Sequence, residues 1–379
     1  MTTLRVILDQ LAAPVPGGIG RYTRELTRAL IATQPRGCSV TGWVPASPES
    51  VYREIEASLP GLAELEKSVF DRRQIAAAWQ HGFTRLGARS TTHAPSLLAP
   101  LFRHDRVNNP GDQIVVTIHD AVPWTHPETL TPRGVSWHRA MAARAERYAD
   151  AVVVPTHAVA EALRDVLELG DRVRIIAGAV SSDLVVPPDA AQLRRDLELP
   201  ERYVVAVGTV EPRKGLDDLV RALALLDRAD LPLVHVGPQG WGDLDLGVLA
   251  DDAGLDRERV RALGYLADAQ VAAVMQGAAV FVMPSRAEGF GLPLLEAMSL
   301  GAPTIHTDAP ALVEVAGGAG LAVELEPAEG LPQRLAEAIR SVVDDESYAE
   351  TLRVAGHDRV GAFSWRDSAE KTWQLHADL

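Results

Sequence analysis

The sequence predicts an α/β protein with two domains, each built on a parallel β-sheet. The chain has 379 residues, more than one ordinary hydrophobic core encloses. Apolar strand patterns alternate with helix patterns in both halves, which is typical of parallel sheets. Residues 179–200 interrupt this alternation with several prolines and resemble a linker. We therefore expect domains at residues 1–185 and 186–361, followed by a terminal helical segment at 362–379.

The composition is that of a globular protein and argues against several other classes. Hydrophobic residues make up 47% and charged residues 23% of the chain. The 37 basic and 51 acidic residues give a net charge of −14, which disfavours a nucleic-acid-binding protein. No apolar run approaches the roughly 18 residues of a spanning helix, and the N-terminus leads straight into a strand, so we expect a cytoplasmic protein. The single cysteine, Cys38, excludes an intrachain disulfide and a cysteine-based zinc site.

A glycine loop at residues 16–22 stands between the first expected strand and a helix at 21–33. Free N–H groups and the dipole at a helix start favour an anion, so the loop could hold a phosphate. A glycine turn needed only for packing explains the same residues. The dinucleotide fingerprint G-x-G-x-x-G is not met. Strands of this half are expected at residues 4–9, 39–44, 114–118, 151–155 and 173–176.

The strand at 114–118 carries His119 and Asp120 at its carboxyl end. Ligands of open α/β sheets bind outside these ends, so the histidine is well placed for a catalytic role. The pair could equally be a satisfied structural contact.

Two basic segments depart from the acidic average of the chain. Residues 72–106 contain six arginines and the single acid Asp105, interleaved with large apolar residues, and residues 134–149 form a second basic helix candidate. They could provide a surface for an anionic acceptor or a peripheral membrane contact through the N-terminal domain. Arginines on solvated helix faces are the plainer explanation.

In the second half, a loop at residues 208–215 places Arg213 and Lys214 between a strand and a helix. Two fixed cations at this position suit a diphosphate, although an exposed charged turn is the alternative. Only three of the 37 basic residues are lysines, which makes Lys214 more notable. Strands are expected at residues 203–207, 233–236, 260–263, 280–283 and 303–306, and helices at 331–343, 347–360 and 365–376.

The stretch at residues 283–303 combines a buried strand, a ligand-binding type of loop and a helix. Glu288 lies in the loop, Gly289 and Gly291 allow close backbone approach, and Pro293 suits a first helical turn. Glu296 follows Glu288 by eight positions, which span at most about 12 Å of helix. The two carboxylates could therefore meet different parts of one extended ligand.

Several other enzyme classes lack their residues. The sequence contains no P-loop, no H-E-x-x-H motif and no G-x-S-x-G elbow. The D-x-D pattern at 243–245 lies in an acidic stretch that is typical of a solvated surface. We therefore expect no metal site.

These motifs together resemble one family. Residues 288–298 resemble the E-x7-E motif of the retaining glycosyltransferases of family 4, which have the GT-B fold of two Rossmann-like domains facing a cleft. Residues 17–22 are similar to the family's glycine loop, 118–120 to its central histidine and 211–215 to its phosphate-binding loop. Residues 363–367 resemble the segment from which the last helix crosses back to the N-terminal domain.

The resemblance implies a nucleotide-sugar donor, held mostly by the C-terminal domain, and no metal or other cofactor. Arg213 and Lys214 would neutralise the diphosphate, Glu296 would bind the ribose, and His119 would face the sugar. Thr209 departs from family members that carry a second arginine there. The implied catalytic residues are His119, Glu288, Arg213 and Lys214. The implied donor-binding residues are Gly17, Gly18, Ile19, Gly208, Thr209, Arg213, Lys214, Gly264, Tyr265, Leu266, Glu288, Gly289, Phe290, Gly291, Leu292 and Glu296.

The expected activity is a metal-independent transfer of a hexose, with retained configuration, to a glycan, glycolipid or small-molecule acceptor. GDP-mannose is the favoured donor on family resemblance, and the reaction is expected in the cytoplasm, with the inner face of the membrane as a further possibility. No carboxylate pair for a double displacement is evident, so the resemblance implies front-face attack. Alternatives are a sugar synthase or phosphorylase of the same fold, a non-catalytic nucleotide-sugar sensor and, more remotely, a nicotinamide dehydrogenase.

Overall fold

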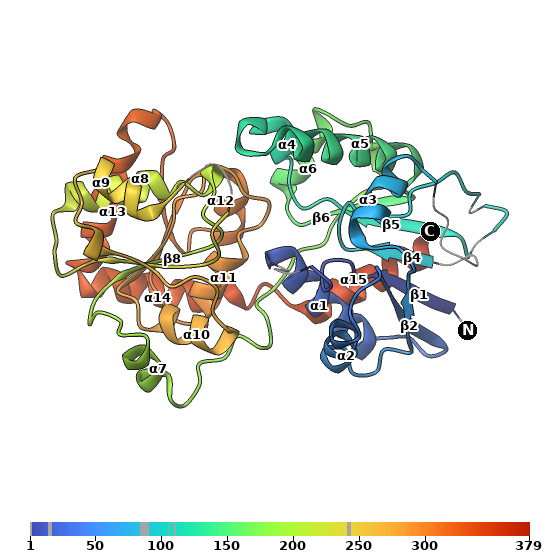
Figure 1. Ribbon diagram of the computed structural model, residues 1–379, viewed down its shortest axis with the longest axis horizontal. Coiled ribbons are helices and arrows are strands. Elements are labelled where there is room, and N and C mark those ends of the chain that lie inside the picture. The colour runs from blue at the N-terminus through green and yellow to red at the C-terminus, as the bar shows by residue number, and fades with distance from the viewer. Residues whose placement is uncertain (1, 14–16, 84–90, 106, 110, 241–243) are drawn as a thin grey trace. The chain divides into compact units, whose positions relative to one another are not determined.

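Two parallel β-sheets, each in its own compact unit, organise the chain (Figure 1). Unit 1 contains Met1–Gly178 and Ser364–Leu379, and unit 2 contains Ala179–Phe363. Alternating strands and helices build both units, so the predicted fold class is confirmed. The computed structural model describes residues 2–13, 17–83, 91–105, 107–109, 111–240 and 244–379.

The described strands of unit 1 form a seven-stranded sheet in the order β3-β2-β1-β4-β5-β6-β7, and every neighbouring pair is parallel. Helices α3, α5 and α6 cover one face, and α1, α2 and α15 cover the other (Figure 1). Its central strands are therefore buried on both sides. The strands are β1 Thr2–Ile7, β2 Cys38–Val44, β3 Glu64–Lys67, β4 Thr91–Ala94, β5 Gln113–Thr117, β6 Ala151–Val154 and β7 Val173–Ile175. The helices are α1 Gly17–Ala32, α2 Glu49–Ser58, α3 Arg72–Gln80, α4 Val122–Thr125, α5 Pro132–Tyr148, α6 His157–Arg164 and α15 Trp365–Asp378.

Unit 2 contains a six-stranded parallel sheet in the order β10-β9-β8-β11-β12-β13 within the described residues. Helices α8, α9 and α13 pack on one face, and α10, α11 and α14 on the other (Figure 1). The strands are β8 Val204–Val207, β9 Leu233–Val236, β10 Val260–Ala262, β11 Val280–Met283, β12 Thr304–Thr307 and β13 Leu321–Val323. The helices are α7 Ala190–Asp196, α8 Leu216–Leu226, α9 Leu246–Asp252, α10 Asp268–Gln276, α11 Leu292–Ser299, α12 Pro310–Ala316, α13 Leu331–Val343 and α14 Glu346–Val360.

The sequence patterns missed three strands, each for a recognisable reason. Strand β3 has the polar sequence ELEK at the sheet edge, and β13 has only three residues. Strand β4 has the sequence TTHA, yet all four of its residues are buried. Threonine and histidine do not produce the apolar run by which a buried strand is recognised.

Two expected boundaries were also wrong. Helix α1 begins at Gly17 rather than at residue 21, so the glycines lie in its first turn and not in a preceding loop. The expected linker at 179–200 belongs to unit 2 and contains helix α7, which packs against α10.

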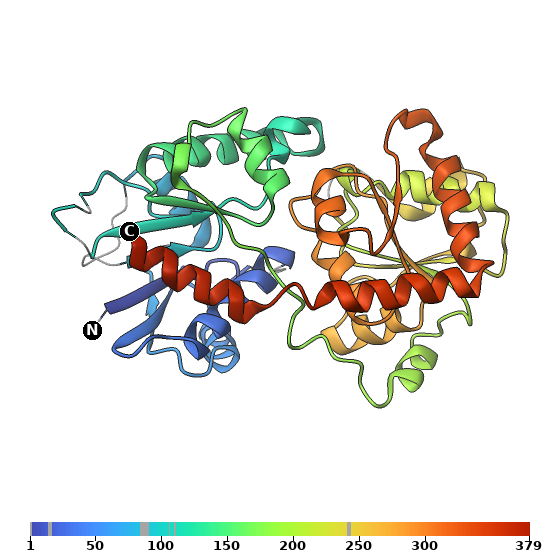
Figure 2. The ribbon, with the colours of Figure 1, turned by 180° about the vertical axis from the view of Figure 1, so that it is seen from behind.

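The terminal helix α15 is part of unit 1, where it lies beside α1 (Figure 2). The indole nitrogen of Trp373 donates to the carbonyl oxygen of Leu30 at 3.1 Å. In the buried interior, the imidazoles of His93 on β4 and His376 on α15 form a hydrogen bond of 3.3 Å. Burial lowers the pKa of His93 to about 4, and burial together with His93 lowers that of His376 well below its ordinary value.

We expect this histidine pair to make unit 1 less stable in acid. The folded pKa values lie below the unfolded value of about 6.5, so the unfolded chain binds protons more readily. The free energy of unfolding should fall as the pH drops from 6.5 toward 4, by up to about 3 kcal/mol for His93. Urea titrations at pH 7.5, 6 and 5 measure this dependence. His376→Gln should make the dependence shallower, because the share of His376 is removed while buried His93 remains, whereas His357→Gln on the exposed surface of α14 should leave it unchanged. Equal slopes in all three proteins would contradict the assignment.

Candidate functional site

The carboxyl ends of four adjacent strands in unit 2 bring most of the expected donor-binding residues to one sheet edge. In sheet order, Gly264 follows β10, Gly237 follows β9, Gly208 follows β8 and Glu288 follows β11. Gly237 was missed by the sequence analysis. A Cβ atom there would lie 1.9 Å from the carbonyl oxygen of Gly208, so this edge admits only glycine at position 237.

The loops after β8 and β11 touch each other at Gly215. This residue has a φ of +63° and ends the short 3-10 helix Pro212–Lys214. A Cβ atom on it would lie 2.1 Å from the carbonyl oxygen of Pro284. A backbone hydrogen bond from Arg286 to the carbonyl of Arg213, at 2.8 Å, also joins the loops. The close packing therefore depends on glycine at position 215.

This packing brings Glu288 between the two expected cations. Lys214 Nζ lies 2.6 Å from Glu288 Oε1, and Arg213 Nη1 lies 3.0 Å from Glu288 Oε2. Burial raises the pKa of the Glu288 carboxyl, but the charges of Lys214 and Arg213 outweigh it and hold the pKa at about 2. The carboxylate is therefore ionised at neutral pH.

The cluster is electrically balanced. Arg213 also donates to Glu211 Oε1 at 2.6 Å and to the carbonyl of Ala287 at 2.8 Å. Two cations, Arg213 and Lys214, thus face two carboxylates, Glu211 and Glu288. An anionic ligand can pair fully with the cations only if Glu288 moves toward another partner.

Arg286 is a second residue that the sequence analysis missed. Its guanidinium binds the Asp217 carboxylate at 2.8 and 2.9 Å and the carbonyl of Pro212 at 2.5 Å. Both partners belong to the loop and helix that carry Lys214. Arg286 therefore holds the loop that carries Lys214 in place. Its position two residues before Glu288 is the sequence feature from which this role could have been predicted.

The segment after Glu288 forms the start of helix α11. Phe290 is buried, Gly291 has a φ of +87°, and Leu292 is the first helical residue. A Cβ atom on Gly291 would lie 2.5 Å from Leu312 Cδ2. Glu296, one turn into the helix, is fully buried. Glu288 thus lies in the loop that leads into α11, while a role for Glu296 in ribose binding stays a prediction.

The remaining expected donor residues of unit 2 lie on the same edge. Gly208 and Thr209 follow β8, and the side chain of Lys214 passes 3.4 Å from the Cβ position of Gly208. Gly264 accepts a hydrogen bond from the amide of Gly237 at 2.9 Å. Tyr265 is 71% exposed beside it, and Leu266 packs against the core.

In unit 1, His119 follows β5 at the carboxyl edge of that sheet. Its Nε2 lies 2.7 Å from the carbonyl oxygen of Pro95 and must donate to it, which leaves Nδ1 unprotonated in the neutral ring. Burial lowers the pKa of His119. The ring also contacts Tyr22 edge-on at 4.8 Å. His119 is therefore a neutral, oriented group, and Asp120 beside it accepts from the amide of Val122 at 3.1 Å.

A cavity of about 630 Å³ opens beside His119. Ile19 of α1 lines it, whereas Gly17 and Gly18 are exposed at the start of that helix. Beneath it lies Asp9, a fully buried carboxylate that the sequence analysis read only as the end of a strand. Its Oδ2 accepts from Arg72 Nε at 3.1 Å. Burial raises the pKa of Asp9 to about 6 even though Arg72 lowers it.

The arginine-rich segment at 72–106 contributes part of this cavity. Arg72 and Arg73 begin helix α3 and line it, while residues 84–90 and 106, with three of the six arginines, lie outside the described residues. Among the described helices, none is long and apolar enough to cross a membrane. Peripheral membrane contact stays a prediction. Of the D-x-D pattern, Asp243 lies outside the described residues and Asp245 caps helix α9.

We expect Glu288→Gln to change both stability and anion binding. The substitution leaves two neighbouring cations without their shared carboxylate, so the free energy of unfolding should fall by about 3 kcal/mol. Inorganic diphosphate should bind this variant more tightly than the wild type, because no carboxylate competes for Arg213 and Lys214. Thermal unfolding with and without diphosphate measures both effects. Glu337→Gln, on the exposed face of α13, is the control. Equal diphosphate affinity in variant and wild type would contradict the competition.

Comparisons with known proteins agree with this arrangement. The chain is 28% identical over 378 residues to O-antigen chain mannosyltransferase B of Escherichia coli, covering 94% of each chain. Among solved structures, it matches HepE of Anabaena in complex with UDP-glucose with a TM-score of 0.75 at 19% identity, covering 100% of both chains. It matches sucrose-phosphate synthase of Thermosynechococcus elongatus with a TM-score of 0.73 at 23% identity, covering 100% and 99%. Both matches show the same two-domain fold.

Two family models match consecutive parts of the chain. The model described as Glycosyltransferase Family 4 matches residues 16–184, and the model described as Glycosyl transferases group 1 matches residues 189–359. Together they span most of unit 1 and of unit 2. The chain therefore belongs to the family 4 glycosyltransferases, with the GT-B fold.

Proposed function

We propose that this glycosyltransferase moves mannose from GDP-mannose to an acceptor hydroxyl and retains the anomeric configuration. The observation that carries the proposal is the Arg213, Lys214 and Glu288 cluster at the carboxyl edge of the unit 2 sheet. It combines cations for a diphosphate with a carboxylate for sugar hydroxyls. The Escherichia coli relative is named as a mannosyltransferase, which supports the choice of sugar.

The donor would lie along the strand ends of unit 2. Its diphosphate would take Arg213 and Lys214 from Glu288, and the released carboxylate would accept hydrogen bonds from hydroxyls of the sugar. The amides at Gly291 and Leu292, at the start of α11, would add donors. The base would lie near Tyr265. On this proposal, donor binding exchanges one set of ion-pair partners for another and leaves no buried charge alone.

The chemical step would depend on leaving-group stabilisation. The bond between the anomeric carbon and the diphosphate oxygen breaks as the bond to the acceptor oxygen forms. The acceptor's proton passes to the leaving diphosphate, so both events occur on one face and the configuration is retained. Arg213 and Lys214 stabilise the negative charge that develops on the diphosphate, which is the task that a metal performs in other transferases. His119 is a neutral, oriented group of unit 1, and its part in the reaction is proposed on the family resemblance alone.

Nucleotide preference tests the donor assignment. GDP and GDP-mannose should raise the melting temperature of the full chain more than UDP, ADP and their sugars. At a concentration of a hundred times Kd, binding stabilises the folded state by about 2.7 kcal/mol. A stronger shift with UDP or ADP would replace the proposed donor, and no shift with any nucleotide would contradict nucleotide binding altogether.

Charge removal tests the proposed catalysis. Lys214→Gln should lower kcat by about a hundredfold or more, because one charge on the leaving group is lost. Lys371→Gln on α15 should leave it unchanged, since that lysine pairs with Asp367 on the surface. Turnover is followed as release of nucleoside diphosphate that depends on the acceptor, with and without EDTA, and NMR assigns the anomer. Inhibition by EDTA would contradict metal independence, and an inverted product would contradict retention.

A further inference from the structure

The unit 1 cavity has a basic lining in an acidic chain. Its charged lining residues, among those that the structure describes, are Arg72, Arg73, Arg133 and Asp120, besides two histidines. The whole chain carries a net charge of −14. The cluster of arginines around this cavity is therefore a local positive region in an acidic protein, and it attracts negatively charged ligands.

Two of these arginines keep their charge available. Arg72 Nε lies 3.1 Å from Asp9 Oδ2, and this ion pair compensates much of the positive charge of Arg72. Neither Arg73 nor Arg133 forms an ion pair with any carboxylate in the described ranges. Both residues are exposed and line the cavity. The cavity thus presents two guanidinium groups to an entering ligand.

The two arginines come from neighbouring helices. Arg73 stands in the first turn of α3 and Arg133 in the first turn of α5, and these helices pack together. The neutral Thr131 side chain caps α5, so the dipole of that helix adds to the charge of Arg133. At the start of α3 the capping carboxylate of Asp71 offsets the positive end of the helix dipole. There the attraction for an anion comes from the guanidinium groups.

The donor geometry favours phosphate over carboxylate. The oxygens around a phosphorus atom are arranged tetrahedrally in a monoester and in a diester, so guanidinium groups from two helices can approach one phosphate from different directions, whereas the two oxygens of a carboxylate lie in one plane. Trp137 and Leu97 add apolar surface to the same cavity, which suits the carbon-rich face of a sugar ring. The volume of about 630 Å³ falls within the range of small-molecule sites.

We infer that the unit 1 cavity binds the acceptor by a phosphate group that Arg73 and Arg133 hold. This inference rests on the proposed function, since it names the acceptor of that reaction as a phosphorylated sugar. The phosphate can belong to a free sugar phosphate or to a sugar joined to a lipid by a phosphodiester. Both sources share the chemistry that the cavity recognises.

Direct binding tests the inference without turnover. The full chain is titrated with inorganic phosphate, glucose 6-phosphate, the decyl phosphodiester of glucose and, as the neutral match, glucose. The phosphate compounds should bind more tightly than glucose, and their affinity should fall as NaCl rises from 50 to 500 mM. Binding of the monoester alone identifies a free sugar phosphate, and binding of the decyl ester identifies a lipid-linked source.

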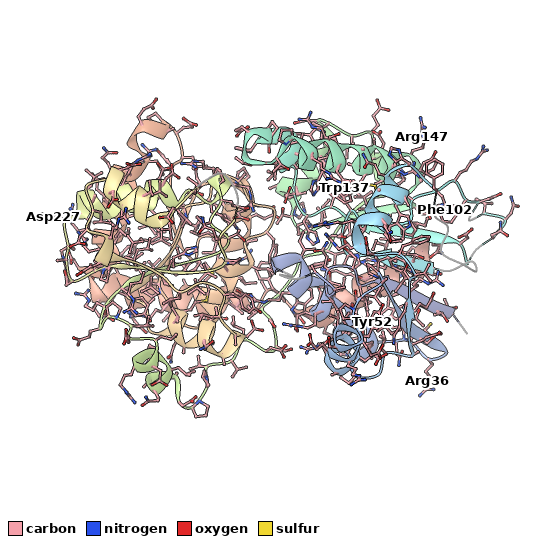
Figure 3. The ribbon with its side chains drawn as sticks, viewed as in Figure 1. Arg36, Tyr52, Phe102, Trp137, Arg147 and Asp227 are labelled. Atoms are coloured by element: carbon pink, nitrogen blue, oxygen red, sulfur yellow. The ribbon has the colours of Figure 1, made fainter. Side chains whose placement is uncertain are left out.

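Matched variants locate the binding. Arg73→Gln and Arg133→Gln should each weaken phosphate binding by about tenfold, because each removes a charge-assisted contact. Arg147→Gln should have no effect, since Arg147 lies in the last turn of helix α5, away from Trp137, which lines the cavity (Figure 3). Lys214→Gln should also leave this binding unchanged. The double variant is also measured in the Lys214→Gln background, so that the cations of unit 2 contribute less to anion binding. Glucose 6-phosphate binding of undiminished affinity in that combined variant, or its disappearance in Lys214→Gln alone, would overturn the inference.

Kinetics separate this inference from the proposed function. With a phosphorylated acceptor, the double variant should raise KM for the acceptor about a hundredfold and leave the Kd of GDP-mannose unchanged. Transfer to the phosphorylated acceptor with equal efficiency in wild type and double variant would overturn the inference and keep the transferase. Phosphate binding at Arg73 and Arg133 without any release of nucleoside diphosphate would overturn the transferase and keep the phosphate site.

Discussion

The contact between the loops after β8 and β11 is the constraint on which the unit 2 site depends. It exists because Gly215 has no side chain, since a Cβ atom would meet the carbonyl oxygen of Pro284 at 2.1 Å. The contact delivers Lys214 and Arg213 to Glu288. Without it, the buried carboxylate of Glu288 would lose both cations, Lys214 would lose this carboxylate and Arg213 would keep only Glu211. An uncompensated buried charge is costly. Glycine at one position therefore supports the electrostatics of the whole edge.

The balanced cluster explains how a site can hold strong charges before its ligand arrives. Arg213 and Lys214 are positioned by Glu211, Glu288 and backbone carbonyls, so little reorganisation is needed when an anion replaces one carboxylate. Glu288 is the partner that can change, because it lies between both cations. A single residue would then link diphosphate binding to sugar recognition.

The two units differ in how they use charge. Unit 2 balances its cations with carboxylates, whereas the cavity of unit 1 keeps two arginines available and places a neutral histidine beside them. Asp9 neutralises Arg72 from below, so the available charge lies with Arg73 and Arg133. This difference suits a donor that brings its own diphosphate to unit 2 and an acceptor recognised separately in unit 1.

The sequence by itself determined the fold class and the position of each motif, because apolar runs and glycine loops are local patterns that can be recognised without the tertiary structure. It predicted Arg213, Lys214 and Glu288 as separate motifs and placed His119 at a strand end. Only the tertiary structure decided which groups meet. Strand β4 is buried yet polar, Asp9 lies beneath a cavity, and Gly237 touches Gly208, and none of these facts has a local pattern. The ion pairing of Glu288 joins residues 74 positions apart in the chain, and contacts of that kind depend on strand order and loop packing rather than on neighbouring residues.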